Sequence, residues 1–137
     1  MKVYVNRQPV SGPWGGGNKT VVALSQALKS YGHDVVYDLG HKNIDLLFCF
    51  DPRPNEVGES YGDLWNYKMK YGTPIVQRVG DVGTHGKPWL TDLVKASSEV
   101  SDMLIFPSLW AMEKIRFSGN NYKIIHNAPL KEFYENR

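Results

Sequence analysis

The chain has 137 residues, of which 42% are hydrophobic and 12% aromatic, and its formal net charge is +2 at pH 7. These values are typical of one folded globular domain and exclude a disordered chain. Lysine and arginine are scattered among acidic residues, so we do not expect nucleic-acid binding. The longest apolar run is far shorter than the ~18 residues of a transmembrane helix, and MKVYVN is not a secretory signal, so a cytoplasmic protein is predicted.

Apolar runs of strand length alternate with helix-like segments along the chain. Strands are predicted at KVYV (2–5), HDVVYD (33–38), IDLLFCF (44–50), PIVQRV (74–79), SDMLIFPS (101–108) and YKIIHN (122–127). Helices are predicted from an Asn18 cap to a stop at Gly32, over 61–71, over 89–100, and from 109 to a stop at Gly119. The alternation predicts an α/β fold, a Rossmann-like, doubly wound and mostly parallel sheet of about six strands with helices on both faces.

The spacing of apolar residues predicts which side chains form the core. The first helix is expected to turn inward a face made of Val21, Leu24, Leu28 and Tyr31. The unbroken apolar run 44–50 is typical of a strand that is buried on both faces. Cys49 lies within that run, so we expect a buried and unreactive thiol.

The stretch GPWGGGNKT (12–20) allows more than one interpretation. It differs by one residue from the phosphate-binding loop of nucleotide hydrolases, G-x-x-x-x-G-K-[ST], because Asn18 separates Gly17 from Lys19. One extra residue turns a helical side chain by about 100°, and a long loop separates the first strand from this helix, both of which disfavour a phosphate loop. In its favour, LLFCFD resembles the apolar strand that ends in a magnesium-binding aspartate, here Asp51.

A second interpretation of this stretch needs no altered phosphate loop. Glycines before a helix let the backbone approach an anionic ligand at the helix N-terminus, where a lysine adds positive charge. The candidate binding residues are then Gly15, Gly16, Gly17, Asn18 and Lys19. A flexible glycine turn with a surface lysine is equally open, and Trp14 either packs in the core or stacks on a sugar ring.

The loop that follows strand 74–79 carries the candidate catalytic groups, because parallel sheets bind ligands at the carboxyl ends of their strands. His85 and Asp81 flank its glycines, and an imidazole or a carboxylate there can accept a proton or stabilise developing charge. The alternative is a solvated histidine and an aspartate that forms a local turn. Arg78 is a candidate substrate-binding residue, or else it pairs with Asp51 or Asp81.

Other polar residues favour structural roles. Asp51 and Arg53 are expected in a rigid surface loop with neighbouring prolines, and Ser108 is expected to cap a helix. No His, Cys or Asp cluster has the spacing of metal ligands, and no serine lies in a nucleophile elbow. Neither a metal nor a bound cofactor is therefore predicted.

Four segments resemble, in the same order, landmarks of the amino-terminal domain of GT-B-fold glycosyltransferases, the group 1 type that includes sucrose- and glycogen-synthase-like enzymes. GPWGGGNKTVVALSQALKSYGHDV resembles their G-G-x-x-[KR] loop, first helix and second strand. TPIVQRVGDVGTHG, SDMLIFPSLWAMEKI and YKIIHNAPLKEFYE resemble three later segments, the last of which enters the linker to a second domain. Gln77 stands where the family often has histidine, and Ala128 where it usually has glycine.

The resemblance implies an acceptor-side domain over 1–127, the start of an interdomain linker over 128–137, and an absent carboxyl-terminal donor domain. It implies transfer of a sugar from a nucleotide sugar, the co-substrate, to an acceptor that is a glycan, a lipid or a small molecule. Alone the chain is expected to be inactive, with the donor domain supplied in cis or in trans. A phosphate-loop-like nucleotide-binding protein and a non-catalytic carbohydrate- or protein-binding module are the alternative functions.

Overall fold

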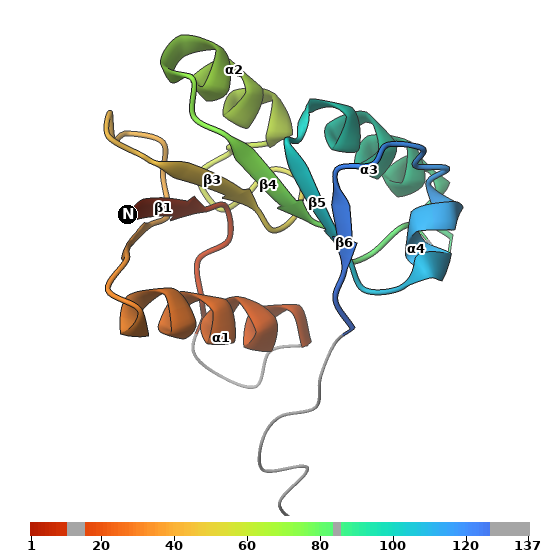
Figure 1. Cartoon of the computed structure of the whole chain (residues 1–137), viewed down its shortest axis with the longest axis horizontal. Coiled ribbons are helices and arrows are strands. Elements are labelled where there is room, and N and C mark those ends of the chain that lie inside the picture. Colours follow the sequence, from red (N-terminus) through yellow and green to blue (C-terminus); the bar gives the residue numbers. More distant parts are fainter. Residues whose placement is uncertain (11–15, 84–85, 127–137) are drawn as a thin grey trace, which may run out of the picture.

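The computed structural model describes residues 1–10, 16–83 and 86–126 (Figure 1). In chain order the elements are β1 (Lys2–Val5), α1 (Gly16–Ser30), β2 (Asp34–Val36), β3 (Leu46–Cys49), α2 (Tyr61–Tyr71), β4 (Ile75–Arg78), α3 (Pro88–Val100), β5 (Met103–Phe106), α4 (Leu109–Lys114) and β6 (Tyr122–Ile124). None of these helices is long and apolar enough to cross a membrane.

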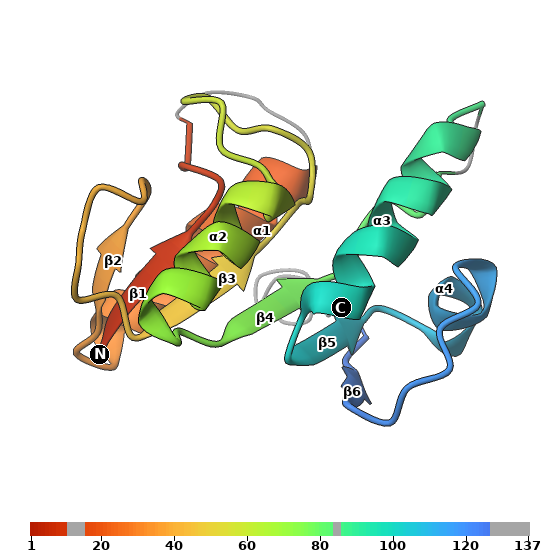
Figure 2. The same ribbon diagram turned by 90° about the horizontal axis from the view of Figure 1, so that it is seen from above.

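The strands form a six-stranded sheet in the order β2-β1-β3-β4-β5-β6, and every neighbouring pair is parallel. Figure 1 shows α1 on one face of the sheet and α2 and α3 on the other, and the turned view of Figure 2 places α4 beside α3. This arrangement confirms the predicted Rossmann-like α/β fold. The strand order reverses between β1 and β3, which is where sheets of this kind hold ligands.

Strand alternation sends neighbouring side chains into different parts of the core. Val3, Val5 and Phe50 pack with Val21 of α1, whereas Tyr4, Leu47 and Ile75 pack with Leu64 and Tyr67 of α2. A third cluster joins β5 to α3 and α4. Both faces of β3 are thus covered, as its unbroken apolar run predicts.

Cys49 is buried at 1% exposure, in agreement with the sequence. Burial raises the pKa of its thiol to about 12, so the group stays neutral and is a poor nucleophile.

Several predicted helix boundaries were confirmed and others were wrong. Helix α2 has the predicted bounds, and the Ser108 hydroxyl caps α4 by accepting a hydrogen bond from the Ala111 amide at 3.1 Å. Helix α1 begins at Gly16, before the predicted Asn18 cap. Tyr31 lies beyond the last residue of that helix and is 82% exposed, so its predicted inward position is wrong. Helix α4 ends at Lys114 rather than at Gly119, because the backbone turns left-handed at Arg116 (φ 56°).

Candidate functional site

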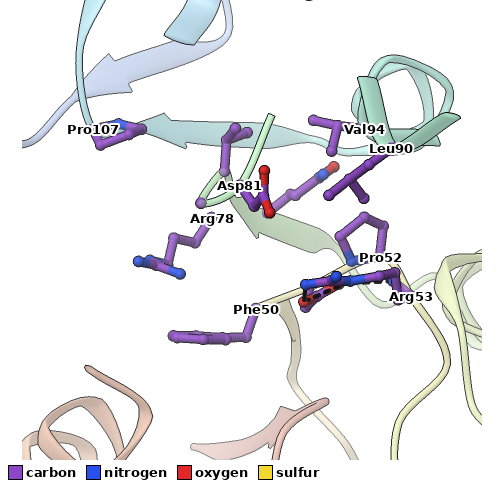
Figure 3. A pocket seen from close by; sticks show the side chains of 12 residues that line it. Phe50, Pro52, Arg53, Arg78, Asp81, Leu90, Val94 and Pro107 are labelled. Carbon is purple, nitrogen blue, oxygen red and sulfur yellow. Dashed lines mark hydrogen bonds and ion pairs between the residues drawn. The ribbon is translucent and has the colours of Figure 1, made fainter. Parts of the chain in front are cut away.

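A cavity of about 320 Å³ opens where the carboxyl ends of β3, β4 and β5 meet (Figure 3). Phe50, Asp51 and Arg53 line it from the loop after β3. Arg78 and Asp81 line it from the end of β4 and the following loop, and Pro107 lines it from the end of β5. A cavity of this size accommodates a small ligand, and it lies at the carboxyl ends of the strands, the edge at which parallel α/β sheets bind ligands.

Asp51 is held by two arginines. Its Oδ2 lies 2.6 Å from Arg53 Nη2, and its Oδ1 lies 3.4 Å from Arg7 Nη2. Burial of the carboxylate opposes ionisation, but the hydrogen bonds from Arg53 and the charge of Arg7 outweigh it and lower the pKa of Asp51. Asp51 is therefore ionised at neutral pH, and its charge is already balanced within the protein.

The loop that carries Phe50 and Asp51 is held in place by hydrogen bonds to Asn6. Asn6 is the residue that directly follows β1, and it is fully buried. Asn6 Oδ1 accepts hydrogen bonds from the backbone amides of Phe50 (2.7 Å) and Asp51 (3.2 Å). Its Nδ2 donates to the carbonyl oxygen of Asp51 at 2.5 Å. Sequence reasoning missed this role, for which the only local signal was a polar residue at the end of a buried strand.

Arg78 occupies a different kind of environment. Cys49 pairs with Gln77 in the sheet, so the next residues, Phe50 and Arg78, lie side by side. The guanidinium carbon of Arg78 lies 4.4 Å from the centre of the Phe50 ring, and Figure 3 shows the two groups stacked beside the cavity. Gly80 leaves room for this position, because a Cβ there would lie 2.8 Å from Arg78 Nη1.

The guanidinium of Arg78 makes no hydrogen bond and no ion pair with any residue that the structure describes. The predicted pairing with Asp51 or Asp81 is therefore not formed. Burial lowers the pKa of Arg78, and only the charge of Asp51 acts in the opposite direction. Arg78 is thus a half-buried cation whose hydrogen-bond donors remain available to a ligand.

Asp81 forms the local turn that the sequence allowed. Its Oδ1 accepts a hydrogen bond from the Gly83 amide at 2.9 Å, and its Oδ2 lies 3.2 Å from Lys87 Nζ. Gly83 adopts φ 88°, and a Cβ there would lie 2.5 Å from the Lys87 carbonyl oxygen, so the turn requires glycine. The hydrogen bond from Gly83, followed by Lys87, lowers the pKa of Asp81, so the carboxylate is a weak base.

Gln77 stands where the resembled family often has histidine, and its contacts are structural. It is fully buried, its Nε2 donates to Ser97 Oγ at 2.8 Å, and its Oε1 accepts from Ser101 Oγ at 2.8 Å. These bonds tie β4 to the end of α3. Both polar ends of the amide are satisfied, which leaves Gln77 no free group for proton transfer.

The remaining predicted site residues are not brought to this cavity by the described part of the chain. Gly15 and His85 lie outside the described residues. Gly16, Gly17 and Asn18 form the first turn of α1 instead of a loop before it, and the Lys19 side chain is exposed. Their predicted contact with a ligand stays a prediction.

A second cavity, of about 230 Å³, lies where the strand order reverses. Arg7, Val10 and Val21 line it, and it shares Phe50 and Asp51 with the larger cavity. Phe50 and Asp51 therefore stand between two adjoining hollows at the carboxyl edge of the sheet.

The described side chains include no group of three or more His, Cys, Asp or Glu residues that could hold a metal ion. In comparisons with known proteins, no protein-family model and no curated protein matches the chain.

Proposed function

We propose that this chain is the acceptor-side domain of a nucleotide-sugar-dependent glycosyltransferase, and that the larger cavity receives the acceptor. One observation carries the proposal. The segments after β4 and β5, which the resemblance to GT-B enzymes identifies as landmarks, are far apart in sequence, yet Asp81 and Pro107 from these segments line one cavity. Fold analogy supplies the reaction type, and the position of the cavity at the carboxyl edge of the sheet supports it.

In glycosyl transfer the acceptor oxygen bonds to the anomeric carbon, the bond to the nucleoside diphosphate breaks, and the acceptor proton passes to a base. The lowered pKa of Asp81 makes this carboxylate a poor proton acceptor. Its negative charge instead suits it to orient an acceptor hydroxyl or to stabilise positive charge on the sugar. The proton acceptor of the proposal is His85, as predicted from the sequence.

The phosphate-loop alternative receives less support. Such a protein needs an aspartate at the end of its apolar strand for magnesium, and Asp51 is the residue in that place. Its carboxylate is engaged by Arg7 and Arg53, at 3.4 and 2.6 Å. Helix α1 also begins well after β1 ends at Val5, whereas a phosphate loop joins its strand and helix directly.

Thermal unfolding with candidate ligands tests the proposal. Monosaccharides and oligosaccharides that act as acceptors should raise the unfolding temperature, since a ligand at a hundred times its dissociation constant adds about 2.7 kcal/mol. UDP-, GDP- and ADP-sugars should give little or no shift, because the proposal assigns donor binding to another domain. A strong shift with magnesium-ATP or magnesium-GTP alone would contradict the proposal and restore the phosphate loop.

An Asp81→Asn variant, with Asp34→Asn as its matched control, separates the site from the rest of the surface. Asp34 is exposed on β2, and its side chain makes no hydrogen bond or ion pair within the described ranges. The shift caused by a saccharide should fall in Asp81→Asn and persist in Asp34→Asn. Equal shifts in both variants would place saccharide binding elsewhere. Saccharide binding without transfer, even after a donor domain is supplied, would favour the non-catalytic module.

A further inference from the structure

The charges around the larger cavity are unevenly matched. The carboxylate of Asp51 is paired with Arg53 and Arg7, and the carboxylate of Asp81 is paired with Lys87. Arg78 is the charged side chain lining the cavity that has no ionic partner among the described residues. Arg78 is thus the lining cation that no described carboxylate contacts, whereas Arg53 and Asp81 each have an oppositely charged neighbour.

Phe50 and Gly80 determine where the guanidinium of Arg78 lies. The Phe50 ring supports the guanidinium from one side at 4.4 Å, which provides a cation–π contact but no hydrogen bond. Gly80 gives it space, since any Cβ would come within 2.8 Å of Nη1. A guanidinium offers five N–H donors in a planar fork, whose geometry matches a carboxylate or phosphate group in a bidentate pair.

We propose that Arg78 binds an anionic group of the acceptor, either a carboxylate or a phosphate. The acceptor is then an acidic sugar or a sugar phosphate. This assignment rests on the glycosyltransferase role proposed above. The cavity of about 320 Å³ matches a ligand of this size. Asp81 complements the assignment. Its ionised carboxylate has acceptor capacity beyond its bonds to Gly83 and Lys87, so it binds hydroxyls and repels a second anion.

Calorimetric titration of the purified chain tests this assignment. Glucuronate and glucose 6-phosphate represent the two anionic classes, glucose is their neutral counterpart, and acetate and inorganic phosphate carry the charge without the sugar. At least one acidic sugar should bind about tenfold or more tightly than glucose, since a charge-assisted bidentate pair is lost with the neutral sugar. Whichever acid binds more tightly identifies the anionic group.

Substitutions of Arg78 test whether this residue causes the preference for acidic sugars. Arg78→Gln should abolish the difference between the acidic and neutral sugars, and Arg78→Lys should retain only part of it, because an ammonium cannot form the bidentate pair. Arg116→Gln is the matched control, since Arg116 is exposed and lines a different cavity with Ser101 and Asn121. That variant should bind every sugar like the wild type. If Arg78→Gln does not fold, added salt should still weaken the wild-type affinity for the acids and leave that for glucose unchanged.

The possible failures are distinct. Equal affinity for glucose and both acids, insensitive to salt and to Arg78→Lys, would overturn the anionic acceptor and leave the glycosyltransferase role standing. Binding of acetate or phosphate that depends on Arg78, with no gain from an attached sugar, would overturn the acceptor assignment together with that role. Absence of binding by any of the five compounds would overturn the acidic-acceptor assignment for these sugars, while binding of other saccharides would still support a glycosyltransferase.

Discussion

The carboxyl ends of β3 and β4 are neighbours in the sheet, but their charged side chains are arranged in opposite ways. After β3, Asp51 is bound by Arg53 and Arg7, and its loop is fixed by hydrogen bonds to the buried Asn6. At the end of β4, Arg78 rests on the Phe50 ring and has no ionic partner in the described part of the chain. The first arrangement is complete without a ligand, and the second leaves the hydrogen-bond donors of Arg78 open to one.

This difference suggests that the end of β3 serves the stability of the fold, whereas the end of β4 serves ligand binding. A charge whose partners are all internal stabilises the fold, and removing one partner leaves the others unbalanced. A half-buried charge without a partner contributes little to the fold and is available for binding. Substitutions at the end of β3 should therefore change stability most, and those at the end of β4 should change binding most.

Asn6→Ala is expected to have the largest effect. The substitution leaves the amides of Phe50 and Asp51 without their acceptor, and each buried unsatisfied group costs about 1–3 kcal/mol. We expect the free energy of unfolding to fall by about 3 kcal/mol, measured by urea denaturation. Asn66→Ala on the exposed side of α2 is the control and should stay within about 0.5 kcal/mol of the wild type. Equal losses in both variants would mean that Asn6 does not hold the loop.

Asp51→Asn should come next and should depend on pH. The folded protein lowers the pKa of Asp51, so its ionised form stabilises the fold above the unfolded-state pKa of about 3.9. That contribution is lost as pH falls through the lower folded-state pKa, where the wild-type carboxyl is protonated and resembles the amide. We expect a loss of about 2 kcal/mol at neutral pH that shrinks below about pH 3.9.

Urea denaturation of both proteins between acidic and neutral pH measures this difference. Asp34→Asn, which removes an exposed carboxylate, should show little difference from the wild type at any pH. The substitution of Asp51 should also strengthen anion binding, because it removes a negative charge near Arg78 and releases two arginines. A stability difference that does not change with pH would show that the ion pairs of Asp51 are not its cause.

The features that the sequence predicted correctly depend on local signals. Helix α2 and strand β1 follow from short-range apolar spacing, and the cap of Ser108 involves a residue three positions away. The turn of Asp81, which the sequence left as the alternative to a catalytic role, involves a residue two positions away. The end of α4 was predicted wrongly because Gly119 is the obvious stop, whereas Arg116 takes the left-handed position in its place.

The features that were missed depend on strand pairing. The contact between Phe50 and Arg78 requires β3 to lie beside β4 with Cys49 opposite Gln77, which no short stretch of sequence encodes. The pair between Arg7 and Asp51 similarly requires β1 beside β3. Because the predicted strands had no assigned order, the sequence could name Arg78 as a candidate but could not distinguish a free guanidinium from a paired one.

Gly80→Ala changes the end of β4 without changing its charge. The new Cβ would come within 2.8 Å of Arg78 Nη1, and the flexible guanidinium can move away at little cost to stability. The movement takes it off the position from which it faces the cavity, so the affinity for an acidic sugar should fall roughly fivefold, or about 1 kcal/mol. Calorimetric titration gives the affinity.

Gly62→Ala is the matched control for Gly80→Ala, because a Cβ at Gly62 would lie 3.8 Å from its nearest neighbour, Ser60 Oγ, which is an ordinary contact distance. This substitution lies within α2 and should raise stability by about 0.5–1 kcal/mol without changing affinity. Unchanged affinity in Gly80→Ala would indicate that the position of the guanidinium over the Phe50 ring is not needed for binding.

Arg116→Gly should have the smallest effect, and it tests whether an arginine without a partner is enough to make a site. Arg116 makes no side-chain hydrogen bond within the described residues, but it is exposed and lies away from the larger cavity. Its φ of 56° costs an L-residue about 1–2 kcal/mol, and glycine avoids this cost. Most of that gain is lost again, because glycine has greater conformational freedom in the unfolded chain. The variant should therefore gain about 0.5 kcal/mol of stability, seen as a small rise in unfolding temperature, and should bind acidic sugars like the wild type. Weaker binding would imply that the net charge of the chain attracts the anion, whereas unchanged binding assigns the attraction to the partly buried guanidinium at the end of β4.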